Sequence, residues 1–301
     1  MFKYSMYNYL IESNVPCKYL TPAITGIVYD KSKTIKVHIT EASIQTTISN
    51  TCHTYKCDDE QMKGIWKNIL YCITFSKMLI EIQCERINDG YLFLLNMPIA
   101  LLIAFNGDLI LHSSCAIINE NIYCFCGSKG AGKSTTAVLL SSLFNNTILF
   151  SDDTICIDVK SGMVYSNYYV QKYTENTMRL FQKNNGIDKV PLDYRNEKYI
   201  IRSTYLGGPK SLSRLRIFYV FQGAEHTFKV IENDHVKLDF LERNIVGYKY
   251  AHAELKSIMK GNVEIIINNF DLKHVILHIP EYSNFSVDEL RKIFKNIIDL
   301  K

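Results

Sequence analysis

Several features that would indicate a repetitive or low-complexity protein are scarce in this chain. It has only 6 Pro and 14 Gly among 301 residues, and no internal repeat is visible, which excludes a collagen-like or linker-rich organisation. The 34 Lys and Arg residues against 30 Asp and Glu give a net charge of +4, too weak to indicate a nucleic-acid partner. A hydrophobic share of 47% is typical of a folded globular protein, and a length of 301 residues suggests one large domain or two smaller ones.

The chain also lacks a long uninterrupted apolar run. The longest, residues 91–105, contains Asn96 and Pro98, whereas a membrane span needs about 18 or more apolar residues. We therefore expect a core helix or a pair of strands there, and no membrane partner. The N-terminal residues 1–10 have no apolar core, so we expect no signal peptide and a cytoplasmic protein.

Cysteine usage favours free thiols. The chain has 9 cysteines, an odd number, and without export disulfides are not expected. Cys124 and Cys126 alternate with aromatic residues on an expected strand, so both should pack on one face of a sheet. The cluster Cys52-His53 and Cys57–Asp59 lacks a second ligand pair at a usual spacing, which argues against zinc.

The first part of the chain, residues 1–105, has the pattern of an α+β module. Residues Gly26–Tyr29 and Thr34–Ile39 alternate between apolar and polar in the manner of strands. The acidic run Asp58–Glu60 precedes an amphipathic stretch, Met62–Phe75, where we expect a helix with acidic residues at its start.

The second part, residues 106–301, has a sharper α/β pattern. A C-terminal helix is expected over Ser286–Leu300, because Ser286 and Glu289 form a capping box. A further helix is expected over Lys133–Phe144. The expected strands are Asp108–Ile118, Ile122–Cys126, Thr147–Phe150, Ile155–Val159, Met163–Tyr165 and Leu215–Phe221.

Residues 127–134 match the pattern G-x-x-x-x-G-K-[ST] of a phosphate-binding loop. Glycines let the backbone curl so that its N–H groups point at phosphate oxygens, and the following helix adds its positive N-terminus. Lys133 would neutralise phosphate charge, and the Ser134 hydroxyl would bind Mg²⁺. The match lies between an apolar strand and an apolar-faced helix, as this motif requires. We therefore expect nucleotide binding by Gly127, Ser128, Lys129, Gly130, Ala131, Gly132, Lys133 and Ser134.

Two adjacent carboxylates, Asp152 and Asp153, follow the expected strand at Thr147–Phe150. An acidic residue at a strand tip beside such a loop commonly holds Mg²⁺. The second carboxylate can then accept a proton from an incoming hydroxyl. The pair predicts a metal ligand and a general base, with the division of roles left open by the strand register.

His112 is the third candidate. Folding Asp108–Ile118 back on Ile122–Cys126 about Glu120 brings residue 114 opposite residue 126. His112 then lies level with the start of the loop, to within a residue or two. Its imidazole can hydrogen-bond the base carboxylate or the transferring phosphoryl group.

These strings together resemble a known family. Leu111–Ser114, the loop, and Ser151–Asp153 resemble the HPr kinase-like serine kinases, whose core is a variant P-loop domain shared with ATP-dependent phosphoenolpyruvate carboxykinases. The resemblance covers roughly residues 97–301, and continues more weakly through Arg179-Leu180, Ser211–Ser213 and Ile279-Pro280. The N-terminal hundred residues look like the extra module of shorter HPr kinase-related proteins, which often belong to clusters that tailor ribosomal peptides, including lasso peptides.

The resemblance implies specific roles. ATP binding would extend to Thr135, Ser134 and one of the two aspartates would bind the metal, and the other aspartate would take the proton, assisted by His112. Of the two assignments we expect Asp153 as the metal ligand and Asp152 as the base. Bifunctional HPr kinase/phosphorylases carry a further acidic-Arg-Gly signature. The nearest string here, residues 241–244, lacks the Gly and stands later in the chain, which argues against HPr as substrate and against the phosphorylase reaction.

The sequence thus predicts an α/β fold, with a variant P-loop kinase domain over residues 106–301 and a smaller α+β module over residues 1–105. The expected function is an ATP- and Mg²⁺-dependent serine kinase acting on a peptide or small protein. Alternatives are an HPr kinase of carbon regulation, a carboxykinase or small-molecule kinase, a transport ATPase, and a non-catalytic regulatory ATP-binding module. The oligomeric state stays open, with a homo-oligomer as one option. The cations Arg179, Lys189, Arg202 and Arg214 are candidates to contact the acceptor.

Overall fold

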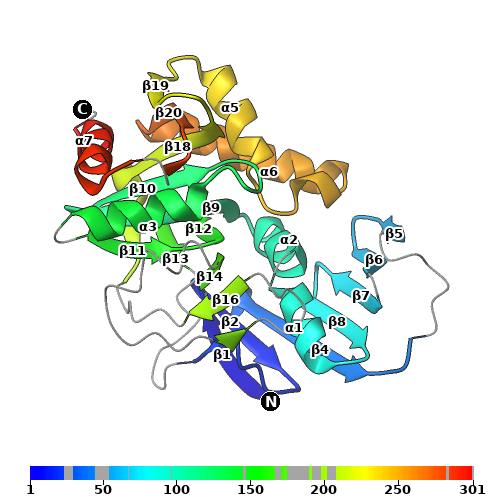
Figure 1. The fold of residues 1–301 in the computed structure, drawn as a ribbon. Helices are drawn as coiled ribbons and strands as arrows, with labels where there is room; N and C mark the ends of the chain where they lie inside the picture. Colours follow the sequence, from blue (N-terminus) through cyan, green and yellow to red (C-terminus); the bar gives the residue numbers. More distant parts are fainter. Residues whose placement is uncertain are drawn as a thin grey trace. The chain divides into compact units, whose positions relative to one another are not determined.

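The chain forms two compact units (Figure 1). The computed structural model describes residues 1–23, 30–44, 54–66, 68–95, 97–144, 147–166, 171–174, 190–191, 198–201, 208–282 and 285–299. Unit 1 comprises residues 1–110, 158–160 and 245–263, and unit 2 comprises the remainder. The domain boundary after residue 105 that the sequence predicts stays a prediction.

Unit 1 contains an eight-stranded mixed sheet with the order β3-β1-β2-β4-β8-β7-β6-β5. Strand β4 confirms the strand predicted at Thr34–Ile39, and its alternate residues Ile35, Val37 and Ile39 are buried. The strand predicted at Gly26–Tyr29 lies outside the described residues. The strands are β1 (Phe2–Met6), β2 (Tyr9–Ser13), β3 (Thr21–Pro22), β4 (Thr34–Glu41), β5 (Thr54–Cys57), β6 (Gln61–Trp66), β7 (Ile69–Thr74) and β8 (Leu79–Cys84).

The helix predicted over Met62–Phe75 is wrong. This stretch forms the antiparallel strands β6 and β7. In β7, Ile69, Tyr71 and Ile73 are buried while the residues between them are half-buried, which is a period of two. Asp58 accepts hydrogen bonds from the N–H groups of residues 60 and 61, so it forms a turn and caps no helix. The β-branched and aromatic side chains of this stretch favour a strand, and this preference outweighs the helix signal of the acidic residues before it.

The apolar run at residues 91–105 belongs to two helices of unit 1, α1 (Ile87–Leu94) and α2 (Met97–Phe105). Residues 98–104 of α2 are all buried, so the run forms core rather than an exposed apolar surface. Two one-turn helices in this unit are η1 (Lys31–Lys33) and η3 (Tyr248–Tyr250). No helix in the described ranges combines the length and apolarity that crossing a membrane requires.

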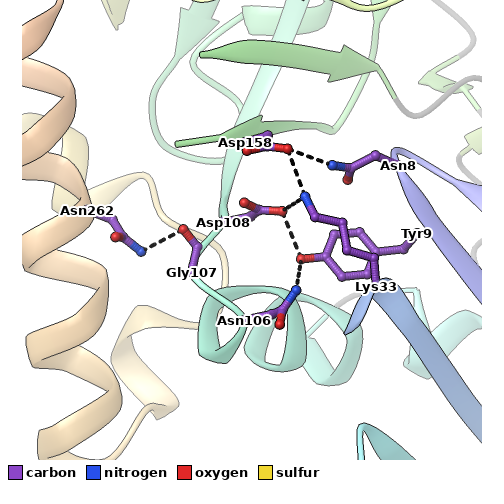
Figure 2. A network of polar contacts seen from close by, with 8 residues as sticks. All are labelled: Asn8, Tyr9, Lys33, Asn106, Gly107, Asp108, Asp158 and Asn262. Atoms are coloured by element: carbon purple, nitrogen blue, oxygen red, sulfur yellow. Dashed lines mark hydrogen bonds and ion pairs between the residues drawn. The ribbon is translucent and has the colours of Figure 1, made fainter. Parts of the chain in front are cut away.

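A nearly buried polar network lies within unit 1 (Figure 2). Nζ of Lys33 lies 2.7 Å from Oδ2 of Asp108 and 2.8 Å from Oδ2 of Asp158, so that one ammonium bridges two carboxylates. The hydroxyl of Tyr9 donates to Asp108 at 2.8 Å, and the amide of Asn8 donates to Asp158 at 3.0 Å. The donors around the two carboxylates offset the cost of burying them.

Unit 2 holds almost all of a nine-stranded mixed sheet with the order β17-β13-β12-β9-β10-β18-β20-β19, in which β11 pairs with β9. The central strands β10, β18 and β20 run parallel, whereas β9 is antiparallel to β10. The strands are β9 (Leu109–Ile118), β10 (Asn121–Cys126), β11 (Thr147–Ser151), β12 (Thr154–Asp158), β13 (Met163–Ser166), β17 (Lys210–Ser211), β18 (Leu215–Gln222), β19 (Thr227–Val230) and β20 (Lys273–Ile279). A separate three-stranded sheet contains β14 (Gln171–Thr174), β15 (Val190–Pro191) and β16 (Lys198–Ile201).

Helices cover both faces of the central strands of unit 2. The apolar side chains of α3 (Lys133–Leu143) and α7 (Val287–Ile298), green and red in Figure 1, share one core with Phe218 and Val220 of β18. On the other face, Phe240 of α5 (Asp234–Arg243) packs against Tyr219, with ring centroids 4.6 Å apart. The remaining helical elements of the chain are η2 (Leu212–Arg214) in unit 2 and α6 (Ala253–Asn269), of which residues 253–263 belong to unit 1. With two mixed sheets and six α-helices in its described part, the fold is mixed α/β.

The predicted elements of unit 2 are confirmed, including the capping box of Ser286 and Glu289 at the start of α7. The predicted hairpin register is wrong by one residue, because Ser113, and not Ser114, lies opposite Cys126. The turn residues Asn119 and Glu120 have φ values of 46° and 66°, typical of a two-residue hairpin loop. The hairpin therefore folds between residues 119 and 120, rather than about Glu120 itself.

Candidate active site

The loop from β10 to α3 curves at its glycines. Gly127, Gly130 and Gly132 have φ values of 148°, 84° and 93°, in the region that favours glycine. A Cβ on Gly127 would lie 2.6 Å from the carbonyl oxygen of Val220, so the loop passes against β18 with no room for a side chain. Helix α3 begins at Lys133, so the N–H groups of its first turn lie at the end of the loop.

Lys133 is buried, with 7% of its surface exposed, and its ammonium is held by the loop itself. Nζ donates to the carbonyl oxygen of Gly127 at 2.9 Å and to that of Ser128 at 3.0 Å. The far side of the loop is tied to β18, where the amide of Gln222 donates to the carbonyl oxygen of Gly130 at 3.1 Å. These contacts hold a positive charge at the centre of a loop of suitable shape for phosphate.

The first aspartate is linked to the loop through a serine. Asp152 is 2% exposed, and its Oδ1 accepts a hydrogen bond of 2.7 Å from Oγ of Ser114. Oγ of Ser114 lies 3.1 Å from Oγ of Ser134, the hydroxyl that follows the loop lysine. Two hydroxyls and one carboxylate thus form a continuous hydrogen-bonded set of oxygen atoms.

The second aspartate faces the histidine instead. Oδ1 of Asp153 lies 3.6 Å from Nε2 of His112, and both side chains are partly exposed. Asp153 has a φ of 73°, an uncommon backbone conformation for a residue with a side chain. Its carbonyl oxygen accepts the N–H of Ser113 at 3.2 Å, so the strained turn is anchored on β9. The adjacent carboxylates therefore point to different partners.

The donor set fits both expected cofactors. Hydroxyl and carboxylate oxygens are the ligands that Mg²⁺ prefers, and Ser134 and Asp152 supply them. The loop backbone, the start of α3 and Lys133 suit a polyphosphate. Asp152 lies on the side of Ser134 and Asp153 lies beside His112, and the roles predicted for the two carboxylates stay predictions.

Two residues in this site carry contacts that the sequence analysis did not assign. Ser114 joins Asp152 to Ser134, and Asn244 accepts the N–H of Gly127 with its side-chain oxygen at 2.9 Å. Ser114 stands in the string that resembles the kinase family, so its position was available as a signal. Asn244 is the last residue of the string 241–244, which departs from the acidic-Arg-Gly signature, so the sequence assigned it no contact.

Other predicted residues fall away from this site or outside the described ranges. Cys124 and Cys126 are buried on one face of β10, with sulfur atoms 3.8 Å apart, and the described cysteines are free thiols, as predicted. Arg214 is exposed in η2. The candidates Arg179, Lys189 and Arg202, and the pair Cys52-His53, lie outside the described residues.

Among the described residues, one group of three His, Cys, Asp or Glu side chains has its ligand atoms close enough together for a metal ion. The ligand atoms of Asp59, His252 and Glu254 lie within 4.8 Å of one another in unit 1. Asp59 and Glu254 are exposed, and exposed acidic groups commonly stand together without a metal.

Comparison with known proteins adds no assignment. The chain matches no protein-family model, and a search of curated proteins finds no significant relative.

Proposed function

We propose that unit 2 is a variant P-loop kinase domain of the HPr kinase-like type, and that the protein is an ATP- and Mg²⁺-dependent serine kinase. The observation that carries this proposal is the split of the acidic pair. Asp152 is joined through Ser114 to the loop hydroxyl of Ser134, while Asp153 lies beside His112. A site that binds nucleotide without transferring phosphate needs the first contact but not the second.

In this proposal the loop backbone and Lys133 bind the phosphates of ATP. Ser134 and Asp152 hold Mg²⁺, which would offset negative charge on the β- and γ-phosphates. Asp153 accepts the proton of the acceptor serine hydroxyl, and His112 orients that carboxylate. The serine oxygen forms a bond to the γ-phosphorus, the bond to the bridging oxygen breaks, and ADP leaves with its electron pair.

The acceptor is proposed to be a serine of a peptide or small protein, as in the tailoring of a ribosomally made, lasso-type precursor peptide. The resemblance to HPr kinase-related proteins supports this class of substrate. Asp153 and His112 are partly exposed, with side-chain accessibilities of 34% and 43%, so a hydroxyl from outside can approach them. The acceptor oxygen must come within about 3–3.5 Å of the γ-phosphorus, in line with the leaving group.

Radiolabelled [γ-³²P]ATP tests this function. The protein is incubated with labelled ATP, Mg²⁺ and a mixture of serine-containing peptides, and with a matched mixture in which alanine replaces each serine. Label on the serine peptides alone supports the proposal. Binding of ATP without label on any peptide would favour the regulatory ATP-binding module instead.

A further inference from the structure

Asn244 occupies the point where two strands of the candidate site separate. The β9–β10 ladder ends with Ser113 opposite Cys126, so His112 and Gly127 would form the next pair. Each instead donates its N–H to Asn244. His112 donates to the backbone oxygen of Asn244 at 2.8 Å, and Gly127 donates to the side-chain oxygen at 2.9 Å.

The orientation of Asn244 is determined by its remaining contacts. Its side-chain Nδ2 donates to the carbonyl oxygen of Phe240 at 2.7 Å, which leaves Oδ1 as the acceptor for Gly127. Its backbone N–H donates to the carbonyl oxygen of Leu241 at 2.9 Å, at the end of α5. The polar groups of this one residue therefore connect a helix end, the loop and the strand that carries His112.

The side chain of Asn244 restrains the first residue of the loop from one side, and Lys133 restrains it from the other. The N–H of Gly127 points to Asn244, while its carbonyl oxygen accepts from Nζ of Lys133 at 2.9 Å. A glycine with a φ of 148° has many alternative conformations, and both neighbouring peptide groups must be held to select this one.

We propose that Asn244 is a positioning residue for phosphoryl transfer, acting through Gly127 and His112; this rests on the function proposed above. Asn244 accepts the two N–H groups of His112 and Gly127, which do not pair with each other across the β9–β10 ladder. It thereby keeps the phosphate loop and the His112–Asp153 pair at a defined separation. Removing the side chain leaves the N–H of Gly127 without this acceptor, so the loop must be ordered again when the nucleotide binds.

The test compares Asn244→Ala with Asn262→Ala in the full chain. Asn262 donates its side-chain amide to the carbonyl oxygen of Gly107 at 3.0 Å in unit 1, so the control also loses a side chain that bonds to backbone. Titration calorimetry measures ATP binding with Mg²⁺ present, and hydrogen exchange measures protection of the Gly127 amide. Asn244→Ala should raise the dissociation constant about tenfold and speed that exchange. Asn262→Ala should change neither.

Asn244→Asp separates positioning from general stability. The aspartate keeps an oxygen for the N–H of Gly127 but loses the donor to Phe240, so exchange at Gly127 should stay closer to wild type than in the alanine variant. If Asn244→Ala and Asn262→Ala have the same affinity for ATP and the same exchange rate at the Gly127 amide, the inference is overturned. The proposed function still stands in that case, provided that the wild type binds ATP. Absence of ATP binding by the wild type would contradict the proposed function itself.

Discussion

Ser114 and Asp152 are joined by a hydrogen bond of 2.7 Å, from the serine hydroxyl to one carboxylate oxygen. Because Oγ of Ser114 also lies 3.1 Å from Oγ of Ser134, this contact connects the buried aspartate to the phosphate loop. The neighbouring Asp153 lies beside His112, with its Oδ1 3.6 Å from Nε2 of the histidine. Replacing one carboxylate should therefore change a different property of the reaction from replacing the other.

We predict that Asp152→Asn raises the Mg²⁺ concentration needed for half-maximal transfer by about tenfold or more, because a ligand carboxylate is lost. Asp153→Asn should lower transfer by about 10²-fold, with the Mg²⁺ requirement of ATP binding unchanged, because only the base is lost. A Mg²⁺ titration of both variants checks this, with Asp271→Asn, an exposed aspartate of unit 2, as control. The reverse pattern would restore the assignment predicted from the sequence.

Lys133→Ala should lower phosphoryl transfer by about 10²-fold or more while the fold is retained, since the ammonium offsets phosphate charge. In the alanine variant the carbonyl oxygens of Gly127 and Ser128 lose this donor. Initial rates and circular dichroism are measured together. Lys292→Ala, which removes an exposed lysine from α7, controls for charge. Near-normal turnover in Lys133→Ala would contradict the phosphate-loop assignment.

The Lys33 network predicts a stability effect in unit 1. Burial raises the pKa of Asp108, and Lys33 opposes this shift; burial lowers the pKa of Lys33, but the hydrogen bonds and charges of Asp108 and Asp158 outweigh burial and raise it. Lys33→Met would leave two carboxylates without their shared cation, and should lower the free energy of unfolding by about 3 kcal/mol. Urea denaturation measures the loss.

Two further variants complete this test. Lys31→Met, at an exposed neighbouring position, should change stability by less than about 0.5 kcal/mol. The triple variant Lys33→Met, Asp108→Asn, Asp158→Asn removes the unpaired charges and should recover part of the loss. If Lys33→Met is as stable as Lys31→Met, the network contributes nothing.

Burial of His274 should lower the free energy of unfolding in acid. It is 1% exposed, and burial, together with the charge of Lys237, lowers its pKa to about 3 from an ordinary value of 6.5. Between these two values the unfolded chain binds a proton that the folded chain does not. The His274 contribution to the free energy of unfolding is therefore complete above pH 6.5, and falls by up to about 1.4 kcal/mol per pH unit as the pH decreases towards 3.

Urea denaturation between pH 7 and pH 4 checks this slope. In His274→Gln the slope should be smaller, and the glutamine oxygen can still accept from the hydroxyl of Tyr219, which lies 2.9 Å from Nδ1 of His274. His235→Gln, on the exposed surface of α5, is the control and should keep the wild-type slope. Equal slopes for both variants would mean that other groups cause the acid sensitivity.

The sequence predicted the elements around the loop well, because each carries a strong local signal. The strand, loop and helix from Asn121 to Leu143 follow from apolar periodicity and glycine spacing. Local signals failed at Met62–Phe75, where the pattern suits a helix and a strand pair alike and the pairing with β8 decides.

The site itself could be predicted only in part. The one-residue error in the β9–β10 register arose from the loop type, since left-handed Asn119 and Glu120 are not signalled by a glycine. The partners of Asp152 and Asp153 depend on which way each side chain turns from β11, which adjacency in sequence does not determine. Asn244 reaches Gly127 across 117 residues of chain, a contact that only the folded backbone brings about.

The mass of an acceptor peptide tests the central claim most directly. The wild-type protein and Lys133→Ala are each incubated with ATP, Mg²⁺ and the mixture of serine-containing peptides, and the masses of the intact peptides are measured by mass spectrometry. The account predicts a gain of about 80 Da on a serine, dependent on Mg²⁺ and lost in the variant. No gain in mass, or transfer of a nucleotidyl group in place of phosphate, would contradict it.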